Sequence, residues 1–205
     1  MPDEIIDVSL WTLSTFLSAA TPADRTRAVK NAVEIYENAY DPRNDFYKRI
    51  RTALENSVAA GSDDPLELAI RNATEAKRSH YTQIATGWKH WSPRSEASVS
   101  GLRGSWTSGS VSIRVSQLLT TSIKRREVLA STYLRAPDLD DNAAQAMTRI
   151  MELAFDRPPG STAVLDIRRP RLIRGRQRHF RNYDDWLESE VAAFEDLFLR
   201  MRRAA

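Results

Sequence analysis

A chain of 205 residues can bury roughly 70% of the surface that it exposes when unfolded, so it needs no covalent support, and without cysteine it can form neither disulfides nor thiolate metal sites. Its hydrophobic fraction of 41% is too high for a disordered chain, and no apolar run reaches the ~20 residues that a membrane span requires. The first residues, Met1-Pro2-Asp3-Glu4, are acidic where a signal peptide would be basic. We therefore expect a cytoplasmic, cysteine-free protein that does not enter a membrane.

The first 91 residues are predicted to form a four-helix region. Apolar residues at spacings of three and four predict a first helix over residues 3–20, with Ile6, Leu10, Leu13 and Leu17 on one stripe. Each of the next three helices is predicted to start where a capping residue precedes a proline, at Thr21-Pro22, Asp41-Pro42 and Asp64-Pro65. Gly61 is expected to end the third helix, and the fourth is expected to be one long helix that ends before Ser92-Pro93.

Residues 92–110 are rich in serine and glycine and lack a helical period. This composition predicts an ordered loop or linker. Trp106 argues against full disorder, because a tryptophan side chain usually packs against a neighbour. We expect residues 1–91 and 111–205 to form one compact unit on either side of this segment.

After residue 110 the period changes from 3.6 to 2, since Val111, Ile113 and Val115 alternate with polar residues. Strands are predicted over residues 111–119, 127–136 and 162–168, and helices over 139–155 and 183–203. The fold class is therefore α+β, with a helical region followed by a small β-β-α-β unit and a C-terminal amphipathic helix. A right-handed crossover would place the third strand parallel to the second.

The net charge of +3 hides one strongly basic segment. Residues 168–181 contain seven arginines and no acidic residue, so the rest of the chain carries a net charge of −4. Guanidinium groups bind phosphates through paired hydrogen bonds and stack on bases. The segment is therefore the candidate nucleic-acid or polyanion site, and its arginines are Arg168, Arg169, Arg171, Arg174, Arg176, Arg178 and Arg181.

The same segment has a second interpretation, in which the protein neutralises it internally. Four acidic residues follow it closely in the sequence and could pair with its arginines: Asp184, Asp185, Glu188 and Glu190. Many basic runs are solvated and bind nothing. The sequence leaves both interpretations open.

Few other residues indicate chemistry. Trp88 and Trp91 could form a stacking platform, but their spacing of three is typical of core residues on one helix face. A metal-dependent nuclease would need carboxylates that converge on one metal, and the candidates are Asp166 and Glu127. The Glu-x-Lys pattern of such sites is absent, so we expect Asp166 to pair with an arginine instead. The three histidines have no metal-binding spacing, and we expect neither a metal nor a cofactor.

Three functions follow in order. The first is a non-catalytic accessory protein that binds nucleic acid or another polyanion through residues 168–181. The second is a protein-interaction or assembly subunit, or a homodimer, that uses an exposed sheet edge or a helical face. The third is a metal-dependent nuclease centred on Asp166 and Glu127.

Overall fold

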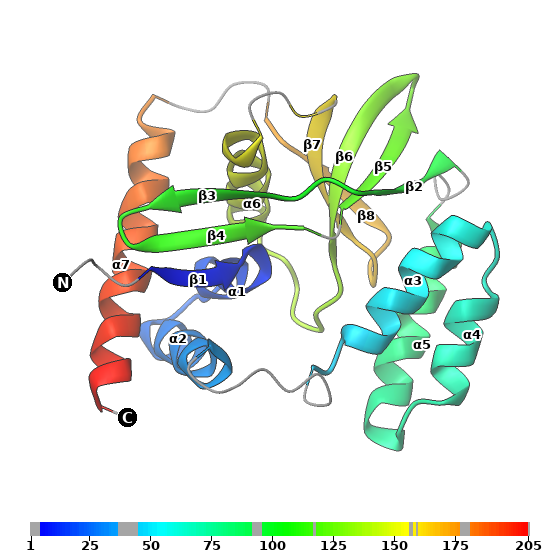
Figure 1. The fold of residues 1–205 in the computed structure, drawn as a ribbon, viewed down its shortest axis with the longest axis horizontal. Helices are drawn as coiled ribbons and strands as arrows, with labels where there is room; N and C mark the ends of the chain where they lie inside the picture. Colours follow the sequence, from blue (N-terminus) through cyan, green and yellow to red (C-terminus); the bar gives the residue numbers. More distant parts are fainter. Residues whose placement is uncertain are drawn as a thin grey trace.

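The computed structural model describes residues 5–36, 45–91, 96–116, 118–155, 158, 160–176 and 181–204. These residues form a mixed α+β fold (Figure 1). Their helices are α1 (Leu10–Leu17), α2 (Pro22–Tyr36), α3 (Lys48–Ala60), α4 (Asp64–Arg71), α5 (Glu75–His90), α6 (Asp141–Ala154) and α7 (Tyr183–Ala204). Their strands are β1 (Ile6–Ser9), β2 (Ser98–Ser100), β3 (Gly104–Ser108), β4 (Val111–Val115), β5 (Leu118–Ile123), β6 (Arg126–Tyr133), β7 (Ser161–Asp166) and β8 (Arg171–Arg174).

The strands form two sheets. A three-stranded sheet has the order β1-β4-β3, and a five-stranded sheet has the order β2-β5-β6-β7-β8. In the larger sheet β5 and β6 form a hairpin, α6 connects β6 to β7, and β7 is parallel to β6. The predicted β-β-α-β unit and its parallel pair are therefore confirmed. The remaining strand, β8, pairs antiparallel with β7 and forms one edge of the sheet.

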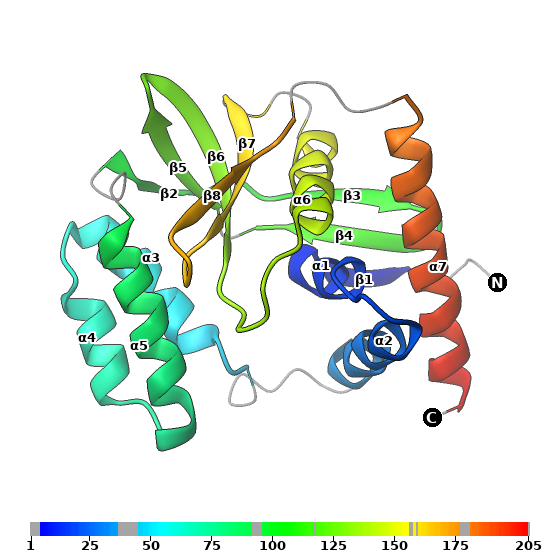
Figure 2. The ribbon, with the colours of Figure 1, turned by 180° about the vertical axis from the view of Figure 1, so that it is seen from behind.

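Helices cover both faces of the five-stranded sheet (Figure 2). Ala163 and Leu165 of β7 pack into a core with α3, α4 and α5, whereas Val164 between them packs into a second core with α6. A strand buried on both faces carries apolar residues in succession rather than in alternation. The second core also holds α1, α2, α7 and β4, and there Phe16 of α1 meets Phe194 of α7 with their ring centroids 5.5 Å apart.

The N-terminal region differs from its prediction at two places. Residues 6–9 form β1, which pairs parallel with β4, so the first helix begins at Leu10 rather than near residue 3. The predicted fourth helix is two helices, because the chain leaves the helical conformation before Thr74, the extended N-cap residue of α5. The predicted end of the third helix is confirmed, since Gly61 follows α3 in the left-handed conformation with φ 61°.

The segment expected to be a loop contains two strands. Within residues 96–110, β2 pairs with β5, and β3 pairs with β4. The predicted strand 111–119 is also divided, since β4 ends at Val115 in the smaller sheet and β5 begins at Leu118 in the larger one. Residues 92–95 and 117 lie outside the described part of the chain. Throughout that part, the helices are too short or too polar to cross a membrane.

Candidate nucleic-acid interface

The arginine segment spans both ends of one edge strand. Arg168 and Arg169 lie in the turn after β7, and β8 then runs antiparallel to β7 until Arg174 stands opposite Ala163. Arg174 and Arg176 therefore lie at the opposite end of the sheet from Arg168 and Arg169. This topology separates the predicted site residues into two groups.

The first group is paired within the protein. Arg169 contacts the carboxylate of Asp138, donates to a carboxylate oxygen of Asp166 at 3.1 Å and donates to the carbonyl oxygen of Ala136 at 2.6 Å. Arg171 donates to the carbonyl oxygen of Leu139 at 2.9 Å and lies 3.5 Å from a carboxylate oxygen of Asp141. These two arginines thus hold the connection between β6 and α6 rather than facing a ligand.

Arg168 faces α5. Its guanidinium is 3.1 Å from the ring nitrogen Nδ1 of His80 and also contacts the side-chain oxygen of Gln83. It therefore fixes the end of β7 to the helical region, and it does not extend the exposed basic surface.

The second group is exposed. Arg174, Arg176 and Arg181 are solvent-exposed, and none of them makes an ion pair with another described residue. Arg178 lies outside the described residues. Gln145 of α6 fixes the backbone here, since its amide nitrogen donates to the carbonyl oxygen of Arg174 and its amide oxygen accepts from the backbone N–H of Arg176, both at 3.0 Å. Exposed cations on a held backbone are suited to contacting a ligand from solution.

The acidic residues at the start of α7 do not pair with the described arginines of this segment. Asp184 accepts hydrogen bonds from Arg149 at 2.8 and 2.7 Å, and this contact helps to raise the pKa of Arg149. Glu190 pairs with Arg25 of α2 at 3.0 Å. Arg176 instead acts on Tyr183: burial raises the pKa of this tyrosine to about 12, and the positive charge of Arg176 opposes the increase.

A second group of cations at the same end of the sheet was not among the predicted site residues. The turn of the β5–β6 hairpin carries Lys124, Arg125 and Arg126, all exposed and none in an ion pair with a described residue. Lys124 and Arg125 have φ values of 52° and 62°, so the turn holds both in the left-handed conformation. Glu127 is the acidic residue next to them. Three consecutive cations in a predicted turn were the available signal.

The hairpin tip, the end of β8 and the start of α7 lie along one end of the molecule (Figure 1). Two strand spacings separate β6 from β8, and Arg126 lies four residues before Ala130, which is level with Arg174. These steps place the backbones of the two groups roughly 16 Å apart. We call this set the sheet-end basic surface, and it consists of Arg174, Arg176, Arg181, Lys124, Arg125 and Arg126.

The two carboxylates considered for a nuclease do not converge. Glu127 precedes Val128, which pairs with Ser161 at the start of β7, whereas Asp166 pairs with Tyr133 at its end. Six residues of extended strand separate the two levels by roughly 20 Å. Asp166 pairs with Arg169, as the sequence predicted. Among the described residues, no three His, Asp or Glu side chains come together in a metal-binding arrangement.

The histidines and tryptophans do not form a separate site in the described residues. His80 contacts Arg168, and the ring of His90 accepts or donates a hydrogen bond to the carbonyl oxygen of Thr86 on its own helix. Trp88 and Trp91 are buried, and their ring centroids are 5.4 Å apart in the core below α3 and α5. The prediction that these tryptophans are core residues is confirmed.

Asp166 provides a prediction about pH. Burial raises its pKa above the ordinary value, while the charge of Arg169 opposes the increase. The native protein therefore keeps this proton where the unfolded chain has released it, so the contribution of Asp166 to folding is favourable below about pH 4 and is lost as the pH rises through the raised pKa. We expect wild type to lose stability relative to Asp166→Asn over that range.

Urea denaturation of both proteins between about pH 4 and pH 7 measures this difference. Arg169 keeps Asp138 and the carbonyl oxygen of Ala136 as partners in the variant, so both proteins should fold. If wild type instead gains stability relative to the variant as the pH rises, attraction to Arg169 outweighs the cost of burying the charge.

Comparison with known proteins gives no match. No family model matches the chain, and no curated protein or solved structure is significantly similar to it.

Proposed function

We propose that this protein binds nucleic acid through the sheet-end basic surface and acts by binding rather than by catalysis. The observation that carries the proposal is the division of the arginine segment. Arg169 and Arg171 are paired with carboxylates, whereas Arg174, Arg176 and Arg181 are exposed and without an ion pair among the described residues. Unpaired guanidinium groups retain the hydrogen-bond donors that phosphates require.

The position of the hairpin cations supports the same proposal. Lys124, Arg125 and Arg126 extend the positive surface beyond the arginine segment along the same end of the sheet. A backbone separation of roughly 16 Å between the groups, with side chains that reach inward, suits phosphates on the two sides of a groove about 12 Å wide. We therefore expect duplex DNA or RNA to contact both groups at once, chiefly through phosphates and without sequence preference.

A protein partner is the second candidate. The edge strand β2 carries Val99, which is 42% exposed, and Leu102 just beyond it is 38% exposed. An edge strand offers unpaired backbone groups to another chain. The charge of the sheet-end basic surface favours nucleic acid as the first candidate, and β2 lies at the other edge of the sheet.

Fluorescence anisotropy tests the proposal directly. A labelled duplex of mixed sequence and its separate single strand are titrated with protein at low salt, where electrostatic binding is strongest. We expect binding of the duplex, with similar affinity for an unrelated sequence. If neither nucleic acid binds, the proposal is wrong and a protein partner becomes the first candidate.

A further inference from the structure

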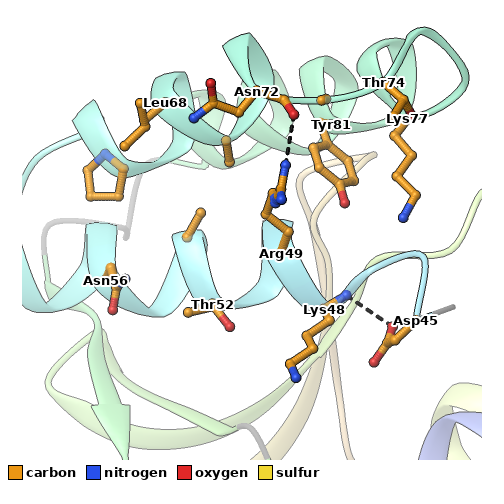
Figure 3. Close-up of a pocket in the computed structure, with 14 residues that line it drawn as sticks. Asp45, Lys48, Arg49, Thr52, Asn56, Leu68, Asn72, Thr74, Lys77 and Tyr81 are labelled. Carbon is orange, nitrogen blue, oxygen red and sulfur yellow. Dashed lines mark hydrogen bonds between the residues drawn. The ribbon is translucent and has the colours of Figure 1, made fainter. Parts of the chain in front are cut away.

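A groove between α3 and the α4–α5 pair lies apart from the sheet-end basic surface (Figure 3). Its volume is about 700 Å³, within the range of small-molecule sites in proteins. Alanine, leucine and proline side chains of α3 and α4 supply apolar wall, and Tyr81 of α5 lies at one end. The groove is also lined by polar side chains with hydrogen-bonding capacity, namely Thr52, Asn56, Asn72 and Thr74.

The charged groups of the groove are unbalanced. Three cations line it, Lys48, Arg49 and Lys77, against one acid, Asp45. The Asp45 carboxylate is already used, since one oxygen accepts from the backbone N–H groups of Tyr47 and Lys48 at 3.0 Å and the other accepts from Arg51 at 3.1 Å. Asp45 therefore contributes little to neutralising the cations across the groove.

Two of these cations are held in place without an ion pair. One nitrogen of the Arg49 guanidinium donates to the carbonyl oxygen of Asn72 at 2.7 Å, which draws the side chain across the groove toward the end of α4. The ammonium group of Lys77 lies 5.3 Å from the ring centroid of Phe46. Neither Arg49 nor Lys77 pairs with a carboxylate of the described chain, and the other guanidinium donors of Arg49 make no hydrogen bond there.

We propose that this groove binds a small phosphate monoester that carries hydroxyl groups, such as a sugar phosphate. The phosphate lies between Arg49 and Lys77, where a guanidinium and an ammonium group meet a doubly charged anion. The hydroxyl-bearing part lies along α3 and meets the side chains of Thr52 and Asn56. The groove shares no residue with the sheet-end basic surface, so this proposal is independent of nucleic-acid binding.

Isothermal titration calorimetry in chloride buffer, without phosphate, tests the proposal with glucose 6-phosphate and with glucose as the uncharged comparison. We expect glucose 6-phosphate to bind with a Kd of about 1 mM or lower and glucose to show no binding. Arg49→Gln and Lys77→Gln should each weaken binding about tenfold or more, because each removes hydrogen bonds to a charged group. Arg71→Gln, on the exposed side of α4 and outside the groove lining, is the matched control and should bind as wild type does.

Two results would overturn the proposal. One is no heat of binding from glucose 6-phosphate with the wild-type protein. The other is equal affinity in wild type and in Lys77→Gln, a variant that removes only a half-buried side chain and so should keep the fold. Far-UV circular dichroism of each variant verifies that a loss of binding is not a loss of structure.

Discussion

Replacement of Arg174, Arg176 and Arg181 by alanine should weaken duplex binding by roughly a hundredfold or more at low salt. Each arginine that contacts a phosphate contributes a charge-assisted hydrogen bond, and three such losses multiply. The loss should be similar for unrelated sequences, because phosphate contacts position a protein without reading bases. The thermal melt should change little, since these side chains are exposed and unpaired among the described residues.

A matched control removes three positive charges at the far end of the molecule. Arg27 and Lys30 lie on α2 and Arg200 lies near the end of α7, away from the sheet-end basic surface (Figure 1). Their replacement by alanine makes the same change in net charge and should reduce binding far less. If both triple variants lose affinity equally, only net charge attracts the nucleic acid and no particular surface binds it.

Gly87→Ala should destabilise the fold by about 3 kcal/mol, at the upper end of the usual cost of overpacking. Gly87 lies in α5 where this helix packs against the end of β7, and a Cβ atom there would be 1.8 Å from the carbonyl oxygen of Ile167. Because the obstructing atom belongs to the backbone, either α5 or the strand end must move. Helix propensity alone predicts the opposite sign, since alanine favours a helix over glycine by about 1 kcal/mol.

Gly101→Ala is the control for this prediction, since a Cβ atom there would have no neighbour within 4 Å. It should change stability by less than about 0.5 kcal/mol. Urea denaturation followed by far-UV circular dichroism measures both variants. A Gly87→Ala protein as stable as wild type would mean that α5 does not pack this closely on the sheet.

Local patterns were sufficient to predict most of the fold. The β6–α6–β7 crossover was predicted because residues 127–168 change period from 2 to 3.6 and back. Asp140 begins α6 as an N-cap, and its side chain accepts from the backbone N–H groups of Asn142 and Ala143. Gly61 supplied the left-handed residue after α3. Each of these signals lies within a few residues of the structure that it specifies.

The elements that the sequence failed to predict depend on distant partners. The residues of β1 have apolar positions that fit the stripe of the following helix, and only pairing with β4, about a hundred residues later, makes them a strand. β2 and β3 are short and rich in serine and glycine, and their strand conformation comes from pairing with β5 and β4. Single-sequence patterns contain no information about such pairing.

The same distinction applies to the candidate site. The charge sum located residues 168–181, but it could not show which arginines are paired. The partners of Arg169 and Arg171 include Asp138 and Asp141, which come from the connection between β6 and α6 some thirty residues earlier. The hairpin cations join the exposed arginines only because β6, β7 and β8 are neighbours in one sheet.

The dependence of duplex binding on salt tests the central claim most directly. Neutralisation of three to six phosphates by the sheet-end basic surface predicts a plot of log Kobs against log salt concentration with a slope of roughly −3 to −5. In the variant that lacks Arg174, Arg176 and Arg181, the slope should become shallower by about 3. The claim would be contradicted by an affinity that does not change with salt, or by the same slope in wild type and variant.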